Sequence, residues 1–259
     1  MSNDVFIWKN AKQFSIIQMA IVFVLPSMIA FTGFRLILPK LVENDMPAII
    51  AWPLVASVML FAFAIFAIFL LKKEAQELNI SFRERACLKK LSLKEWGVFV
   101  GILILGFISA LILGKGSTYL TQVPGLSVPE YFTFFLNPTI DPMNTDPSIL
   151  TPGFVLKGAT WMIPFIALTL FLNILTEELY FRAWVLPKLA KYGKLSWVIN
   201  GILFAFYHSF QLWLVPSILP VSLVIAFVVY KSKSIWPAFA FHMAVNMVTV
   251  LGMMMLILS

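Results

Sequence analysis

Charge is scarce in this sequence. Only 12% of its 259 residues are charged, against about a quarter in an ordinary soluble domain, and 61% are hydrophobic. This composition excludes a water-soluble globular protein, a disordered chain and a DNA-binding domain. Cysteine is nearly absent as well, because Cys87 is the single one, which excludes an internal disulfide framework and a thiolate cluster. We therefore expect one membrane domain with no soluble domain attached.

Long apolar runs dominate the chain. A transmembrane helix needs about 20 mostly apolar residues, and seven segments reach or nearly reach this length. We predict an all-α, polytopic membrane bundle of about seven helices, within a range of about six to eight. The sixth segment is short, so we expect it to be tilted or joined to its neighbour. The predicted spans are residues 14–38, 46–71, 96–114, 158–182, 195–215, 217–230 and 235–258.

Lysine and arginine lie mainly on one side of the predicted membrane. With a cytoplasmic N-terminus, fourteen of them fall in cytoplasmic connectors and four on the outer side. Because basic loops stay in the cytoplasm, we predict that the N-terminus is cytoplasmic and that the C-terminus is outside. We predict a single domain over 1–259, divided into an N-terminal three-helix part (1–115), an outer connector (116–153) and a core (154–259).

Two connectors are long. Residues 72–95 are basic, and we expect them to lie on the inner leaflet, where basic residues bind anionic lipid. Residues 115–153 carry an aromatic patch at 131–135 that we expect to dip into the outer interface. Membrane lipids thus account for the basic residues, and we predict no nucleic-acid partner.

Ionisable side chains inside the spans are few and costly, at about 2.5–3.5 kcal/mol each near mid-bilayer. The fourth predicted span alone carries a cluster of them, Glu177, Glu178 and Arg182. Both histidines of the chain, His208 and His242, also lie in apolar runs. Ionisable residues at membrane depth mark functional sites by default, so we predict a site on these spans.

The spacing of these groups predicts that they meet. Glu177 lies 16 residues before Gly193, where spans four and five join, and His208 lies 15 residues after it. At the helical rise, both are about 22–24 Å from the turn, whereas His242 and Asn246 lie about 12 and 18 Å along the last span. We predict one cavity, open to the cytoplasm, with the carboxylate, imidazole and amide groups that a hydrolase needs.

Each group also has a purely structural interpretation. Glu178 and Arg182 are spaced i and i+4, which favours an ion pair that holds helices together. An intramembrane histidine is often a helix–helix hydrogen bond, and we interpret Asn173 and Asn200 as packing or supporting groups. Costly groups at compatible depths on three spans nevertheless favour one common site.

Three short motifs occur in order along the chain: Glu177-Glu178-xxx-Arg182, Phe204-xxx-His208 and His242-xxx-Asn246. They resemble the motifs of the CPBP (CAAX protease and bacteriocin-processing, or Abi) intramembrane peptidases, which include the Ras-converting type of CAAX prenyl endopeptidase. The resemblance covers roughly residues 158–258, and it implies an endopeptidase that is reached from the cytoplasmic side. The first three spans match no signature.

The resemblance also implies roles for the motif residues. Glu177 polarises the attacking water with help from His208, and His242 and Asn246 hold the oxyanion. Glu178 and Arg182 position the cluster. We predict that no cofactor is required. Zinc held by Glu177, His208 and His242 is the alternative, although the chain has no H-E-x-x-H motif.

The substrate class implied by the resemblance is a peptide or a protein tail, such as a prenylated tail, a peptide pheromone or a bacteriocin leader. Two other function classes fit the intramembrane charges. A transporter is one, but the sequence has no inverted repeat. A non-catalytic immunity protein or an assembly subunit of a membrane complex is the other, and the complete motif set argues against it.

Overall fold

The computed structural model describes residues 6–258, and this part of the chain contains helices and loops but no strand. The predicted all-α bundle is therefore confirmed. Among the described residues, six helical runs are long and apolar enough to cross a membrane, and the chain is an integral membrane protein. The runs are Ile16–Glu43, Ala48–Glu77, Leu93–Leu120, Met162–Tyr207, Ser209–Ser232 and Trp236–Leu258.

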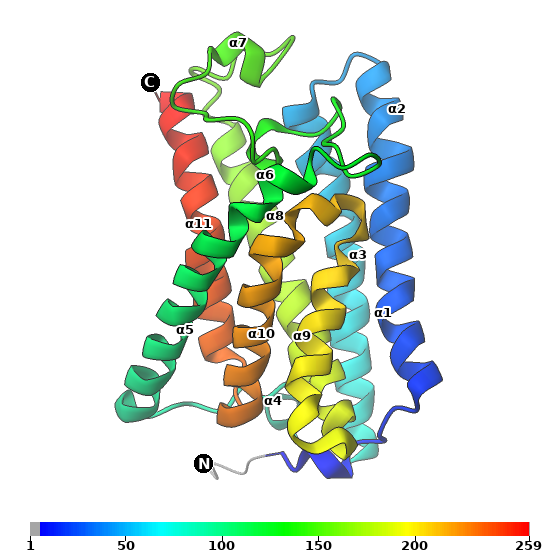
Figure 1. Ribbon diagram of the computed structural model, residues 1–259. Helices are drawn as coiled ribbons and strands as arrows, with labels where there is room; N and C mark the ends of the chain where they lie inside the picture. Colours follow the sequence, from blue (N-terminus) through cyan, green and yellow to red (C-terminus); the bar gives the residue numbers. More distant parts are fainter. Residues whose placement is uncertain (1–5, 259) are drawn as a thin grey trace.

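The helices form one antiparallel bundle, with the first described residues and the end of the last helix at opposite ends (Figure 1). We call these the basic end, at the bottom of Figure 1, and the connector end, at the top. The elements of the first half are η1 (Trp8–Asn10), α1 (Ile16–Phe31), η2 (Thr32–Ile37), α2 (Leu38–Glu43), α3 (Ala48–Glu77), α4 (Phe82–Arg85), α5 (Leu93–Gly114) and α6 (Gly116–Leu120). Those of the second half are η3 (Phe134–Leu136), α7 (Pro147–Leu150), α8 (Met162–Glu177), η4 (Glu178–Val185), η5 (Leu186–Leu195), α9 (Ser196–Tyr207), η6 (Ser209–Leu214), α10 (Val215–Ser232) and α11 (Trp236–Leu258).

The predicted fifth span, 195–215, is not one continuous helix. The chain reverses at Gly193, whose φ of 60° favours glycine, and α9 then has only 12 residues. Such a helix is about 18 Å long, which is too short to cross a hydrocarbon core of about 30 Å. It ends at His208, and the η6 turn leads into α10. His208 therefore lies at a helix end inside the bundle.

The connector between α6 and α8 lies over the bundle (Figure 1). Its aromatic patch does not face the membrane interface as predicted, because Phe132 and Phe134 are buried in the protein. The Phe132 ring packs edge-on against Trp213 of η6 at 5.4 Å, and the Trp213 indole N–H donates to the carbonyl oxygen of Leu136 at 2.8 Å. A buried indole needs such an acceptor, so the connector is tied to the turn that follows His208.

The basic connector, residues 72–95, is also fixed to the protein, through a buried arginine. Arg85 is completely buried, and its Nε donates to Glu74 Oε2 at 2.8 Å, while its Nη1 donates to the carbonyl oxygen of Ala183 at 2.6 Å. Lys188 donates to the other oxygen of Glu74. We call these three charged residues the Glu74 network. It joins α3, α4 and η5 beneath the core.

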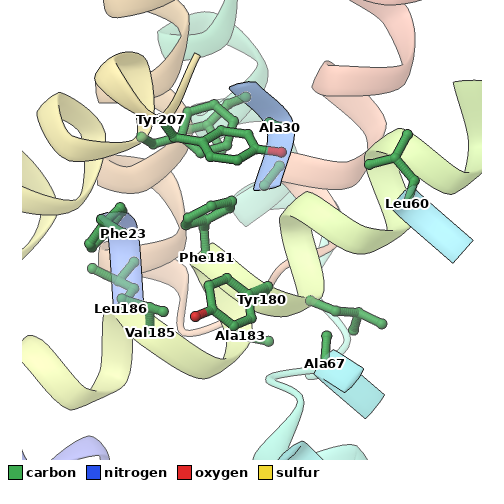
Figure 2. Packing of buried hydrophobic residues seen from close by; sticks show 14 of the residues in the cluster. Phe23, Ala30, Leu60, Ala67, Tyr180, Phe181, Ala183, Val185, Leu186 and Tyr207 are labelled. Carbon is green, nitrogen blue, oxygen red and sulfur yellow. The ribbon is translucent and has the colours of Figure 1, made fainter. Parts of the chain in front are cut away.

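The core packs around η4 (Figure 2). Phe181 is completely buried, with its ring 5.4 Å from that of Phe23 on α1 and 4.9 Å from that of Tyr207 on α9. Tyr180 donates its hydroxyl to the carbonyl oxygen of Val22 at 3.0 Å. Aromatic packing therefore holds η4 between the first span and the helix that ends at His208.

We expect Gly201→Ala to lower the stability of the protein by about 1–3 kcal/mol, because it overpacks the contact between α9 and α10. A Cβ at Gly201 would lie 2.9 Å from the Cα of Leu223, which is backbone and cannot rotate away. Gly97→Ala is the matched control, because nothing lies within 4 Å of that position in α5, and alanine in a helix normally stabilises. Thermal unfolding in detergent measures both variants, and equal midpoints would contradict the expectation.

Candidate active site

The predicted carboxylate and both histidines come together. Glu177 is the last residue of α8 and is 2% exposed. Its Oε1 lies 3.7 Å from Nε2 of His208, and its Oε2 lies 3.8 Å from Nε2 of His242. One carboxylate and two imidazoles, from three segments of the chain, thus lie close together. These separations are longer than direct hydrogen bonds, so the three groups face one another across a narrow gap.

The other nitrogen of each imidazole is held by a different acceptor. Nδ1 of His242 donates to Glu178 Oε1 at 2.9 Å, and Nδ1 of His208 donates to the carbonyl oxygen of Phe204 at 3.1 Å. These bonds orient both rings so that Nε2 points to Glu177. His242 has a side-chain carboxyl group behind it and His208 a backbone carbonyl, so the two imidazoles are not chemically equivalent.

The winding of the chain changes from α-helical in α8 to π-helical in η4 between the two adjacent glutamates. A π-helical segment in an α-helix leaves some backbone carbonyls without their usual partners and often marks a functional site. Here the carbonyl oxygen of Phe181 accepts from Asn200 Nδ2 at 2.9 Å, and that of Ala183 accepts from Arg85. Donors from other segments thus bind carbonyls of the π-helical segment, which begins directly after Glu177.

The predicted ion pair between Glu178 and Arg182 is not formed in the described part of the chain. Arg182 is completely buried, and its guanidinium lies over the Phe204 ring, 3.9 Å from the ring centroid. None of its three nitrogens has a hydrogen-bond partner among the described residues. The i, i+4 argument assumed α-helical winding, whereas η4 is π-helical and Glu178 turns to His242 instead.

Two asparagines complete the cluster. Asn246 lies one turn along α11 from His242, and its Nδ2 donates to the carbonyl oxygen of His242 at 3.0 Å. Asn173, which we interpreted only as a packing or supporting group, donates from Nδ2 to Glu177 Oε1 at 2.9 Å. Its position four residues before Glu177 is the sequence signal that points to this contact.

The cluster lies in the wall of a cavity of about 830 Å³, which Glu177, His208, His242 and Asn246 all line. The cavity extends toward the connector end, where Phe135 and Leu136 of the connector line it. With a cytoplasmic N-terminus this is the outer end, so the cavity does not extend in the cytoplasmic direction that we expected. Counting residues along each helix predicted the depth of the cluster in the bundle. It did not predict on which side of the cluster the cavity lies.

Comparison with known proteins identifies the second half of the chain. Residues 159–248 match the family described as type II CAAX prenyl endopeptidase Rce1-like. The match supports the assignment of this segment to the CPBP/CAAX protease family. The match includes all six predicted catalytic residues and stops short of the first three helical runs. No curated protein and no solved structure matches the chain.

The CAAX protease domain contains the two histidines and one carboxylate of the zinc alternative. Two imidazoles and a carboxylate are a ligand set that zinc accepts in catalytic sites. Within residues 6–258, however, no three side chains of His, Cys, Asp or Glu are arranged to hold one ion. We therefore derive no step through a metal.

The first span supports the CAAX protease domain at the turn after His208. Arg35 Nε donates to the carbonyl oxygen of Phe210 at 2.8 Å, and Ser27 Oγ lies 2.8 Å from Ser209 Oγ. The Phe34 ring stacks on that of Phe210 at 4.4 Å. Sequence reasoning did not predict this role, because the partners are far apart in the chain.

Proposed function

We propose that this protein is an intramembrane endopeptidase in which Glu177 activates a water molecule for attack on a peptide carbonyl. The supporting observation is that both oxygens of Glu177 face an imidazole Nε2, at 3.7 and 3.8 Å, in the wall of a large cavity. His208 donates through Nδ1, so its Nε2 is an acceptor. A water between Glu177 and His208 can donate to both groups and then transfer a proton to Glu177.

The same geometry supports the later steps. As the water oxygen bonds to the carbonyl carbon, negative charge develops on the carbonyl oxygen and requires donors. Asn246 has two amide hydrogens, and only one is used by the carbonyl of His242. The Glu178 carboxylate stabilises positive charge on His242, whose Nε2–H is then a second donor. The proton taken by Glu177 passes to the leaving amine as the C–N bond breaks.

The apolar cavity favours a substrate with a hydrophobic or lipid-modified segment. A prenylated tail, a peptide pheromone and a bacteriocin leader all meet this requirement. We also propose a cytoplasmic N-terminus, supported by the fourteen basic residues in connectors on that side. The cavity then leads away from the cytoplasm, which supports cleavage within the membrane and not at the cytoplasmic interface that the sequence suggested.

The test is cleavage of internally quenched peptides, prenylated and unmodified, by the full chain in nanodiscs. We expect cleavage at the same rate with and without a zinc chelator. Loss of cleavage that added zinc restores would contradict the metal-free mechanism. Peptide binding without any cleavage would support the non-catalytic alternative, and proton-coupled flux in proteoliposomes without cleavage would support a transporter.

A further inference from the structure

Gln211 is a buried polar residue that none of the three motifs contains. It lies in η6, three residues after His208, and is 7% exposed. Its backbone N–H donates to the carbonyl oxygen of His208 at 2.9 Å, and its φ of −144° and ψ of 51° interrupt the helix there. Gln211 lines the same cavity as Glu177 and His208. Its backbone is therefore fixed relative to the catalytic cluster.

The side-chain amide of Gln211 has no hydrogen-bond partner among residues 6–258, and its Oε1 is fully buried. Two other polar groups of the cavity wall are satisfied by the preceding turn, whereas the Trp52 indole N–H in the same wall is also buried without a partner among the described residues. Thr169 donates to the carbonyl oxygen of Phe165, and Ser217 donates to that of Leu214. A buried acceptor without a donor costs about 1–3 kcal/mol, which a ligand that brings a donor would recover.

The turn that carries Gln211 is held from two sides. Arg35 of the first span binds the carbonyl of Phe210, and Trp213 binds the connector through Leu136. The backbone that carries the amide is therefore fixed, and only the side-chain torsions of Gln211 have to be set when it binds. The turn lies at the helix end where His208 also lies.

We propose that Gln211 turns its side-chain amide toward the cavity and accepts a hydrogen bond from one backbone N–H of the peptide substrate. This inference rests on the proposed endopeptidase function. The walls of the cavity are mostly apolar, so a substrate backbone N–H inside it needs a specific acceptor. The bond sets which peptide bond faces Glu177, and it makes Gln211 a residue that determines the cleavage position.

The test combines a substitution with backbone N-methylation of a cleaved quenched peptide. Gln211→Leu is expected to raise KM about tenfold with little change in kcat, because it removes a binding interaction. One N-methylated position is expected to raise KM equally in the wild type and to have no further effect in Gln211→Leu. Gln76→Leu, the same change on an exposed residue of α3 outside the cavity wall, is the matched control, and we expect wild-type KM for it.

Independent effects of Gln211→Leu and of every N-methyl group would overturn the proposal, as would an unchanged KM. Gln211→Met, which has a similar length and no amide, replaces Gln211→Leu if the latter lowers the unfolding temperature. If the wild type cleaves no peptide, the proposed function fails, and the same N-methyl series measured by peptide binding still tests Gln211.

Discussion

Glu177→Gln is expected to lower kcat/KM for peptide cleavage by about a thousandfold while the protein stays folded. Glutamine has the same shape as glutamate, and its amide oxygen still accepts the bond from Asn173 Nδ2. It cannot take a proton from water, and general base catalysis contributes about 10²–10⁴-fold in rate. The measurement is quenched-peptide kinetics together with thermal unfolding of the same preparation.

Glu43→Gln provides the matched control, because the same change is made on an exposed residue at the end of α2. It should leave both cleavage and unfolding unchanged. A Glu177→Gln protein that cleaves at the wild-type rate would refute the role of Glu177. Equal loss of activity and of thermal stability would instead indicate that Glu177 holds the helices together.

The meeting of Glu177, His208 and His242 was predictable because the membrane restricts where such groups can lie. A polar side chain in hydrocarbon is tolerated mainly when it faces another polar group or a cavity. Few arrangements of the helices therefore allow five ionisable residues on three spans. Counting residues along the helices showed that these five lie at similar depths. The all-α fold was predictable for a similar reason, since a helix satisfies its own backbone in lipid.

The local winding around Glu178 was not predictable from neighbouring residues. It is accompanied by donors from distant segments, Asn200 on α9 and Arg85 at the end of α4, which bind the carbonyls of Phe181 and Ala183. Without these contacts an α-helix is the default, and the i, i+4 pair of Glu178 and Arg182 follows from it. The direction of the cavity depends in the same way on how whole helices pack.

Glu74 is a charged residue whose burial cannot be predicted from its position along a transmembrane span. It lies near the end of an apolar run, beside Lys72 and Lys73, where side chains normally reach water. In the structure it is buried with Arg85 and Lys188 because η1, η5 and the basic connector close that end of the bundle. Packing between distant segments therefore buries a charged residue that its position alone would place at the membrane interface.

Glu74→Gln is accordingly expected to lower the free energy of unfolding by about 3–5 kcal/mol, the usual cost of leaving buried charges without their partner. Arg85 is completely buried and Lys188 nearly so, and Glu74 is the only acidic residue that either contacts in the described chain. Thermal or denaturant unfolding in detergent measures the loss. Because Arg85 also binds the Ala183 carbonyl of η4, cleavage should decline as the network is broken.

Glu77→Gln, three residues further along α3, shows whether burial or charge alone determines the loss of stability. Glu77 lies on the same helix and pairs with Lys73 at 3.9 Å, but these side chains are 60% and 62% exposed. An exposed pair contributes at most about 1 kcal/mol, so this variant should unfold almost like the wild type. Equal losses for the two variants would show that the Glu74 network is not buried. Replacing Glu74, Arg85 and Lys188 together with apolar residues should recover most of the stability lost in Glu74→Gln, because no unpaired charge then remains inside.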